Sequence, residues 1–338
     1  MNMKKIFLLK VIVVALIVLI GLLIYFLKFA KNYPSPRDLN SKKDFFGVTF
    51  STKFSEELGL DWKEVYLAIL DDLQVKLVRI PFYWDEIEPV QGSYDFSDYD
   101  YLISEGESRD VKFIITVGRR QPRWPECHAP GWLINQNDSD TRTATLAMVK
   151  TVVERYRDRD SVEYWQVENE PYFAAFGVCP PLNEALLAEE VEMVRSLDDR
   201  PIIITGSGEM SSWRKEGKMG DIFGTTLYRV VYNSWFGYTK YPLPVSWYKL
   251  KAKLAGISSD RLMLLELQAE PWVPNGNMTQ LTKQEIDRSM SVEQFKANLQ
   301  YAINLDWQRS YAWGVEWWYW QKKFGTPEYW LIAKELFK

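Results

Sequence analysis

The sequence predicts one α/β domain, a (β/α)₈ barrel preceded by a single N-terminal transmembrane helix. Three observations predict the barrel. After residue 44, apolar runs of strand length alternate with amphipathic stretches about eight times, and several of these runs are apolar almost throughout. Polar residues follow the runs. Strands buried on both faces have this character in parallel sheets covered by helices. A doubly wound open sheet is the structural alternative, and no G-x-G-x-x-G or P-loop pattern favours it.

The strands are expected at 45–50, 75–84, 111–118, 162–167, 201–208, 228–236, 261–268 and 311–320. Helical patterns are expected near 61–73, 97–108, 142–157, 183–197 and 291–305. Each helical pattern lies between two of the apolar runs, as a crossover connection between parallel strands requires.

The N-terminus carries the apolar run "IFLLKVIVVALIVLIGLLIYFL" at 6–27, whose only charge is Lys10. A run of this length can cross a hydrocarbon core of about 30 Å, and it exceeds the roughly 7–15 apolar residues of a cleaved signal peptide. We therefore expect a membrane anchor in residues 1–30, a tether in 31–44 and a catalytic barrel in 45–338. Lysines flank the run on both sides, so the orientation is weakly encoded; we favour a barrel outside the cytoplasm.

The composition excludes some classes of protein. The 338 residues carry a net charge of −4, with 41 basic and 45 acidic residues, which disfavours nucleic-acid binding. Two cysteines and one histidine offer no metal-ligand pattern, so no metal or cofactor is expected. The 15 Trp, 19 Tyr and 17 Phe are numerous, and several lie in expected loops, where flat apolar faces suit a sugar ring. The oligomeric state is left open.

Cys127 and Cys179 lie in two proline-rich loops, "WPECHAP" and "GVCPPLN". The barrel layout puts both loops on one rim, so a disulfide is favoured over two buried free thiols. A disulfide would agree with a location outside the cytoplasm.

Polar side chains follow the expected strands at their carboxyl ends, where barrel enzymes build their active sites. They are Arg79, Arg119, Arg120, Asn169, Glu170, Tyr232, Asn233, Glu266, Gln268 and Glu316, accompanied by Trp317, Trp318 and Trp320. Each has an ordinary alternative as a solvated rim residue or, for Arg79, as a buried structural ion pair. Together they place several carboxyl groups and an aromatic wall on one face.

Two carboxyl groups on facing strands are what glycoside hydrolysis needs: one protonates the leaving oxygen and the other meets the developing positive charge. Glu170 ends the fourth strand in "WQVENEP", and Glu266 ends the seventh. Arg79 could keep a nearby carboxylate ionised, which suits a nucleophile, so Glu266 takes that role and Glu170 that of the acid. Asn169 could hydrogen-bond a ring hydroxyl.

The motifs "VRIPFYWDEIEPVQGSYDFSDYDYL", "WQVENEP", "LMLLELQAEPW" and "WGVEWWYW" resemble clan A glycoside hydrolases. These are retaining (β/α)₈ enzymes that include family 5 cellulases and mannanases and family 42 β-galactosidases. The resemblance covers about residues 45–338. It implies Glu170 as acid/base, Glu266 as nucleophile, Arg79 beside it, and a sugar-stacking tryptophan among Trp317, Trp318 and Trp320.

The resemblance leaves several points open. It implies a tyrosine or histidine near the nucleophile, which Tyr232 would supply. Glu168 competes with Glu170 as the acid, and Glu270 with Glu266 as the nucleophile. Many family 5 enzymes carry cleft histidines, whereas this chain has only His128, so the family and the sugar are not fixed by these motifs.

Long aromatic loops suggest a carbohydrate substrate of several units. Trp124 and Trp132 lie in the loop at 117–132 and are candidates to line subsites. We expect a retaining β-glycoside hydrolase acting on a β-linked oligo- or polysaccharide. The alternatives are an envelope polysaccharide transglycosylase, which would use the same covalent intermediate, and an inactive carbohydrate-binding barrel, which would be expected to lose one carboxylate.

Overall fold

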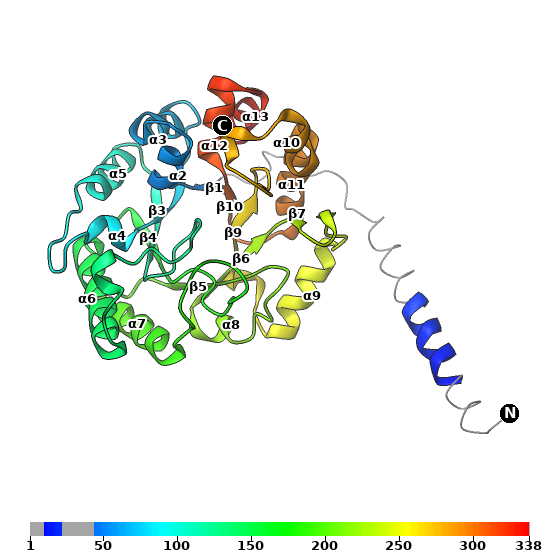
Figure 1. The fold of residues 1–338 in the computed structure, drawn as a ribbon, viewed down its shortest axis with the longest axis horizontal. Helices are drawn as coiled ribbons and strands as arrows, with labels where there is room; N and C mark the ends of the chain where they lie inside the picture. The colour runs from blue at the N-terminus through cyan, green and yellow to red at the C-terminus, as the bar shows by residue number, and fades with distance from the viewer. Residues whose placement is uncertain (1–9, 22–43, 338) are drawn as a thin grey trace.

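The computed structural model describes residues 10–21 and 44–337. Eight parallel strands close into a barrel in the order β1-β10-β9-β6-β5-β4-β3-β2, and helices surround it (Figure 1). The predicted (β/α)₈ barrel is therefore confirmed. The barrel strands are β1 (Phe46–Thr49), β2 (Leu77–Pro81), β3 (Lys112–Val117), β4 (Val162–Val167), β5 (Ile202–Gly206), β6 (Ile222–Leu227), β9 (Leu262–Gln268) and β10 (Ser310–Trp313).

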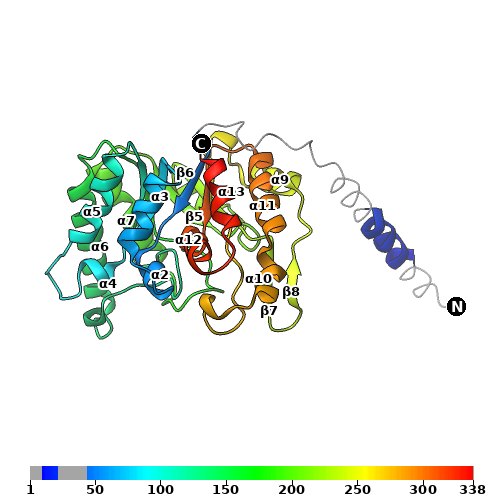
Figure 2. The same cartoon turned by 90° about the horizontal axis from the view of Figure 1, so that it is seen from above.

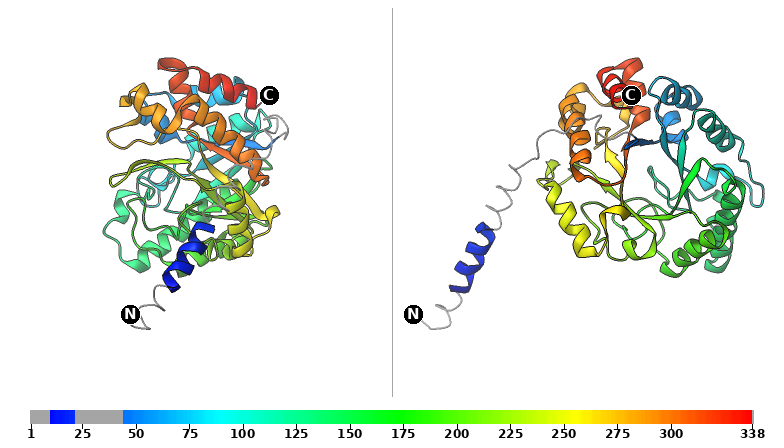
Figure 3. Two further views of the ribbon diagram at one scale, coloured as in Figure 1. Left: turned by 90° about the vertical axis from the view of Figure 1, so that its right-hand side faces the viewer. Right: turned by 180° about the vertical axis from the view of Figure 1, so that it is seen from behind.

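Long helices cover the outside of the barrel, and Figure 3 shows them from two further sides. They are α3 (Trp62–Asp71), α5 (Ser97–Glu107), α6 (Asp138–Tyr156), α7 (Glu184–Leu197), α9 (Val245–Ala255), α10 (Lys283–Met290), α11 (Val292–Leu305), α12 (Val315–Phe324) and α13 (Glu328–Leu336). Shorter helices are α2 (Thr52–Glu57), α4 (Trp84–Ile87) and α8 (Glu216–Met219), with 3₁₀ turns at Gly131–Leu133, Ser259–Arg261 and Met278–Gln280. Side chains of Asp61, Asn137 and Asn183 cap α3, α6 and α7, which fixes where these helices begin.

The core has two layers. A large outer cluster fills the space between strands and helices, and a smaller cluster that includes Leu77, Ile114, Ile203, Met263 and Leu265 fills the barrel itself. This division follows from the strands' alternation, since successive side chains point to opposite faces.

Strand β9 carries a bulge that positions the site. Its pairing with β6 moves from Thr225↔Leu264 to Thr226↔Glu266, and its pairing with β10 also shifts by one residue there. Strict alternation would place Glu266 on the outer face with Leu264. The extra residue in β9 returns Glu266 to the inner face, where it meets Arg79.

The sixth strand was predicted wrongly at 228–236. The barrel strand is β6, "IFGTTL", and the predicted run instead contains β7 (Val230–Asn233), which pairs with β8 (Gly237–Lys240) in an antiparallel hairpin. The barrel strand was missed because Gly and Thr lower its apolarity. Gly224 is required by close packing, since a Cβ there would lie 2.6 Å from Leu265 Cδ1.

The eighth strand was predicted too long at 311–320. It ends at Trp313, Gly314 turns the chain with φ +113°, and 315–324 form helix α12. A run of aromatic residues fits a strand or a buried helix equally well, so the pattern alone did not locate the change.

Within residues 10–21 and 44–337, no helix combines the length and the apolar character that a membrane crossing needs. Residues 10–21 are helical, and the predicted span at 6–27 continues at both ends into residues outside the described ranges.

Candidate active site

The site lies where the barrel strands end. The segments that follow the strands, including α2, α4 and the β7–β8 hairpin, lie on one face of the barrel, the lower one in Figure 2. In barrel enzymes this is the face on which catalytic residues gather.

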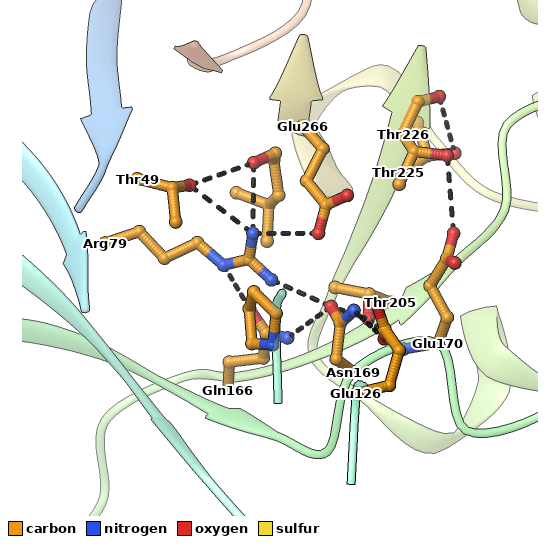
Figure 4. A network of polar contacts seen from close by, with 12 residues as sticks. Thr49, Arg79, Glu126, Gln166, Asn169, Glu170, Thr205, Thr225, Thr226 and Glu266 are labelled. Atoms are coloured by element: carbon orange, nitrogen blue, oxygen red, sulfur yellow. Dashed lines mark hydrogen bonds and ion pairs between the residues drawn. The ribbon is translucent and has the colours of Figure 1, made fainter. Parts of the chain in front are cut away.

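Arg79 of β2 is the centre of a buried hydrogen-bond network (Figure 4). Its Nη1 donates to Glu266 Oε1 at 3.1 Å and to the Leu265 carbonyl at 3.2 Å, while Nη2 donates to Asn169 Oδ1 at 2.8 Å. Its Nε donates to Gln166 Oε1 at 2.8 Å. The guanidinium therefore joins the ends of β4 and β9 as a buried ion pair with Glu266, and a role of Arg79 in substrate binding stays a prediction.

The end of β4 turns sharply to present Asn169 and Glu170. Both Glu168 and Glu170 have positive φ, 56° and 43°, a conformation that non-glycine residues rarely adopt. The Glu170 backbone N–H donates to Thr205 Oγ1 at 2.7 Å, and Thr226 Oγ1 donates to Glu170 Oε1 at 3.3 Å. Strand β5 thus holds the backbone of Glu170, and strand β6 holds its carboxyl group.

Glu170 is an acid whose surroundings favour its protonated form. Burial raises its pKa well above the ordinary value, and the nearby carboxyl groups of Glu266, Glu126 and Glu209 raise it further, against a smaller opposing effect of Arg120. No cation donates a hydrogen bond to its carboxyl group in the described part of the chain. These are the conditions under which a carboxylic acid keeps its proton for donation.

Glu266 of β9 has the opposite surroundings. Besides Arg79, it accepts a hydrogen bond from Tyr228 Oη to Oε2 at 3.2 Å. Tyr232 was predicted to lie near the nucleophile, but it lies in the β7–β8 hairpin, where its ring packs edge-on against Tyr238. Tyr228, four residues earlier, makes the contact, and it was missed because the sixth strand was displaced.

Glu126 is a third carboxyl group at the site, and no sequence motif predicted it there. Its Oε2 accepts from Asn169 Nδ2 at 3.1 Å and lies 3.8 Å from Arg120 Nε. Burial, followed by repulsion from Glu266, raises the pKa of Glu126 to about 8. Its position beside Cys127 in the loop after β3 was the available signal, but only the folded loop brings it to Asn169.

The two competing acids have other partners. The Glu168 carboxyl group accepts hydrogen bonds from the backbone of Arg119 and Arg120, and it lines a cavity of about 310 Å³ together with Glu190 and the α7 side chains Leu186 and Leu187. Glu270 is bound by Arg123, with Nη1 to Oε1 at 2.5 Å. In the part of the chain that the structure describes, neither carboxyl group is a hydrogen-bond or ion-pair partner of Arg79, and both are thereby set apart from the Glu170–Glu266 pair.

The tryptophans named from the eighth strand lie on α12. Trp317 and Trp318 are completely buried, packing against Tyr329 and Phe295 respectively, so they belong to the core and offer no sugar face. Trp320 is half-buried against Phe324. The strand itself ends with Trp313, whose ring lies under the guanidinium of Arg123. Trp313 was missed because the strand was expected to continue.

The remaining predicted residues lie around this centre. Glu316 is fully buried and accepts from Ser51 N and from Arg123. Gln268 binds the backbone of Arg229 and Val230 and so fixes the turn after β6.

The loop tryptophans differ from each other. Trp124 is 62% exposed and contacts Phe176, whereas Trp132 is half-buried and donates to the Glu88 carbonyl.

Cys127 and Cys179 form a disulfide that joins the loops after β3 and β4. Within residues 10–21 and 44–337, no group of three or more His, Cys, Asp or Glu side chains is placed to hold a metal ion.

A closed parallel barrel with acids at the ends of its fourth and seventh strands defines the class of (β/α)₈ glycoside hydrolases. Residues 41–252 match the model of the family described as "Cellulase (glycosyl hydrolase family 5)". The match covers more than half of the sequence. The chain belongs to glycosyl hydrolase family 5.

Individual relatives are distant. A β-galactosidase, BgaA of Clostridium cellulovorans, is 26% identical over 166 residues, which are 43% of this chain and 25% of that protein. The chain thus spans only about a quarter of the length of this curated relative. A subfamily-18 family 5 protein from Streptomyces cattleya, solved with GlcNAc, has a TM-score of 0.57 at 14% identity, over 80% of this chain and 70% of the other.

A Bifidobacterium longum protein of the same subfamily, solved with Manβ1-4GlcNAc, has a TM-score of 0.56 at 13% identity, over 80% and 68% of the chains. At these identities the two structures establish a shared fold.

Proposed function

We propose that this chain is a retaining β-glycoside hydrolase in which Glu170 is the acid/base and Glu266 the nucleophile. The observation that carries the proposal is the contrast between the two acids. Glu266 accepts hydrogen bonds from Arg79 and Tyr228, whereas Glu170 is buried near other carboxyl groups that raise its pKa. A carboxyl group that is buried near other acids suits the role of proton donor, and one that accepts hydrogen bonds from an arginine suits the role of nucleophile.

The reaction proceeds in two displacements. Glu170 donates its proton to the glycosidic oxygen while Glu266 attacks the anomeric carbon, so that the leaving sugar departs as an alcohol and a glycosyl ester forms on Glu266. The Glu170 carboxylate then takes a proton from water, whose oxygen attacks the anomeric carbon and releases Glu266. Arg79 and Tyr228 stabilise the Glu266 carboxylate before attack and again as it is released.

The substrate class is a β-linked oligo- or polysaccharide. Family membership supports it, as do the sugars bound in two structures of the same fold, GlcNAc and Manβ1-4GlcNAc. Tyr228 and the Asn169 amide are the groups we propose for contacts with the sugar hydroxyls.

The test is covalent trapping. The barrel is incubated with a panel of aryl β-glycosides and the matching 2-fluoro-glycosides, and the labelled peptide is read by mass spectrometry. A label on Glu266 supports the proposal, whereas a label on Glu270 contradicts the assignment of the nucleophile. Turnover by transfer to a sugar acceptor instead of water would indicate the transglycosylase.

Substitution separates the two roles. Glu266→Gln and Glu170→Gln are each expected to lose at least about 10³-fold in kcat/KM for unactivated glycosides. Glu170→Gln should keep more activity on glycosides with acidic phenol leaving groups, because these need little protonation. The exposed Glu192→Gln is the matched control and should behave as the unaltered protein.

We also propose that the full chain is anchored in a membrane by residues 6–27, with the barrel outside the cytoplasm. The apolar run supports anchoring, and the Cys127–Cys179 disulfide supports an oxidising location. Expressed at full length, the chain should sediment with membranes and resist carbonate extraction, and its barrel should be digested by protease added outside intact spheroplasts. Recovery in the soluble fraction would contradict anchoring.

A further inference from the structure

The loop after β3 crosses the mouth of the barrel. We call residues 119–128 the β3 strap. Arg123, near its middle, reaches across to the opposite side, where Nη1 donates to Glu270 Oε1 at 2.5 Å and Nη2 donates to Glu316 Oε2 at 3.2 Å. Glu270 follows β9 and Glu316 lies on α12, which follows β10. The strap therefore links the β3 side of the barrel to the β9–β10 side.

The Arg123 guanidinium is also held between two aromatic rings. Its carbon lies 3.6 Å from the centre of the Phe54 ring and 4.0 Å from the centre of the Trp313 ring. Phe54 is on α2, which follows β1. Arg123 is 8% exposed and Glu316 is fully buried, so this end of the site is closed by packed side chains and paired charges.

The strap is fastened along its length. Tyr83 Oη donates to the Pro122 carbonyl at 3.1 Å, and the His128 ring contacts the Arg123 carbonyl through Nε2 at 3.1 Å. Within the strap, Gln121 N donates to the Glu126 carbonyl and Glu126 N to the Arg123 carbonyl, at 2.6 and 2.7 Å.

On the side of β4, Arg120 Nη2 donates to the Phe176 carbonyl at 2.8 Å, and the Cys127–Cys179 disulfide joins the two loops. Contacts on both sides therefore hold the strap as one wall of the site.

The positions of the two acids fix the direction of the substrate. Glu170 protonates the leaving oxygen, so the leaving sugars lie on its side, near β4 and β5. The sugar attacked by Glu266 lies between the acids, and any further sugar on its nonreducing side must extend away from Glu170, toward β9, β10 and β1. That is the region that Arg123, Glu270, Glu316 and Trp313 occupy.

We propose that the β3 strap limits the site to one sugar on the nonreducing side of the cleaved bond, so that the protein removes single terminal sugars and does not cut inside a chain. Arg123 is the specificity-determining residue of this wall. The proposal rests on the proposed function, and it differs from the expectation of a cleft for several sugar units. Trp124 is exposed on the strap, so in this proposal it either contacts the leaving-group sugars or lies on the outer surface.

The test uses the unaltered protein and the sugar found to work in the aryl glycoside panel. A β-linked pentasaccharide of that sugar, labelled at its reducing end, is digested and sampled early. Successive loss of one unit, with labelled tetramer before trimer and dimer, supports the strap as a wall. Labelled dimer or trimer released before tetramer overturns it while leaving the hydrolase proposal intact. No turnover of any glycoside in the panel would overturn the hydrolase proposal and this inference with it.

A variant probes the wall directly. Arg123→Gln removes the guanidinium between Phe54 and Trp313, and it should raise kcat/KM for internal bonds relative to terminal ones by roughly tenfold. Glu270→Gln and Glu316→Gln are combined with it, because Arg123 pairs with both carboxyl groups and its loss would leave them buried and unpaired. Arg142→Gln, an exposed arginine paired with Glu189, is the matched control. A folded Arg123 variant that retains purely terminal cleavage would remove Arg123 from the proposal, and if the variant does not fold, the product order of the unaltered protein decides.

Discussion

The two acids of the site differ in the charged groups that surround them. Glu170 and Glu266 are both buried, yet Arg79 donates to Glu266 alone, and the groups around Glu170 are mostly acidic. Glu209 contributes from a distance: it accepts from Tyr248 Oη at 2.5 Å and from Tyr228 N at 3.3 Å, and it raises the pKa of Glu170. A residue that touches neither acid can therefore affect the pH range of the reaction.

The substitution Glu209→Gln should move the alkaline limb of the kcat/KM profile to lower pH. Removing a like charge lowers the pKa of Glu170, so the proton needed for donation is lost at lower pH. The check is a pH profile on an unactivated glycoside. The exposed Glu184→Gln, on α7, serves as control. An unchanged alkaline limb would show that Glu209 does not act on the acid.

Among the elements, the turn from β10 into α12 depends on a single glycine. Gly314 has φ +113°, and a Cβ there would lie 2.5 Å from Glu270 Cβ. The turn ends the strand after Trp313 and leaves room for the Glu270 carboxyl group to reach Arg123.

We expect Gly314→Ala to destabilise the fold by about 1–3 kcal/mol, because alanine is disfavoured at this φ and cannot avoid Glu270. Chemical unfolding with urea measures the change. Gly59→Ala, also at positive φ but with no atom within 4 Å of an added Cβ, separates the conformational cost from the clash. Equal losses in the two variants would remove the clash from the explanation.

The C-terminal helices are tied to α3 through one aspartate. Asp72 accepts hydrogen bonds from Lys322 on α12 and from Lys334 and Trp330 on α13. These hydrogen bonds hold the pKa of Asp72 well below its ordinary value, and the bond from Lys322 has the largest effect.

Because the pKa of Asp72 is lower in the folded chain than in the unfolded one, its contribution is fully present above about pH 4 and is lost as pH falls toward the folded-state value. Asp72→Asn should therefore lower the melting temperature at pH 7 and lower it less at pH 3. Thermal melts at both pH values measure this, with the exposed Asp158→Asn as reference. An equal loss at both pH values would contradict a charge-dependent role.

On the scale of the whole molecule, one covalent bond joins the loops after β3 and β4. The Cys127–Cys179 disulfide spans 52 residues, including all of α6 and β4. Such a cross-link restricts the unfolded chain as well as fixing the β3 strap.

Replacing both cysteines with serine should reduce the free energy of unfolding by roughly 2–4 kcal/mol, as expected for a loop of this length. Urea unfolding of the oxidised protein and of the double variant gives the difference. The variant should also cut internal bonds more often if the disulfide keeps the strap in place. A variant of unchanged stability would indicate that the noncovalent contacts of the strap are sufficient.

The sequence by itself determined the barrel, the positions of seven of its strands and the two acids proposed for catalysis. It could do so because strand-helix alternation is a local pattern and because Glu170 comes three residues after the apolar strand β4, while Glu266 lies near the end of the apolar strand β9. It misplaced the sixth strand and the end of the eighth, where Gly and Thr weakened one pattern and aromatic residues served two structures equally well.

Only the tertiary structure decided which side chains surround the acids. The bulge that turns Glu266 inward is a matter of pairing between strands, and Tyr228, Glu126, Arg123 and Trp313 reach the site from elements far apart in the sequence. No local sequence pattern encodes contacts between residues that are so far apart in the chain. They arise because closing the barrel brings the ends of all eight strands to one face, where the loop after β3 can cross to β9 and β10.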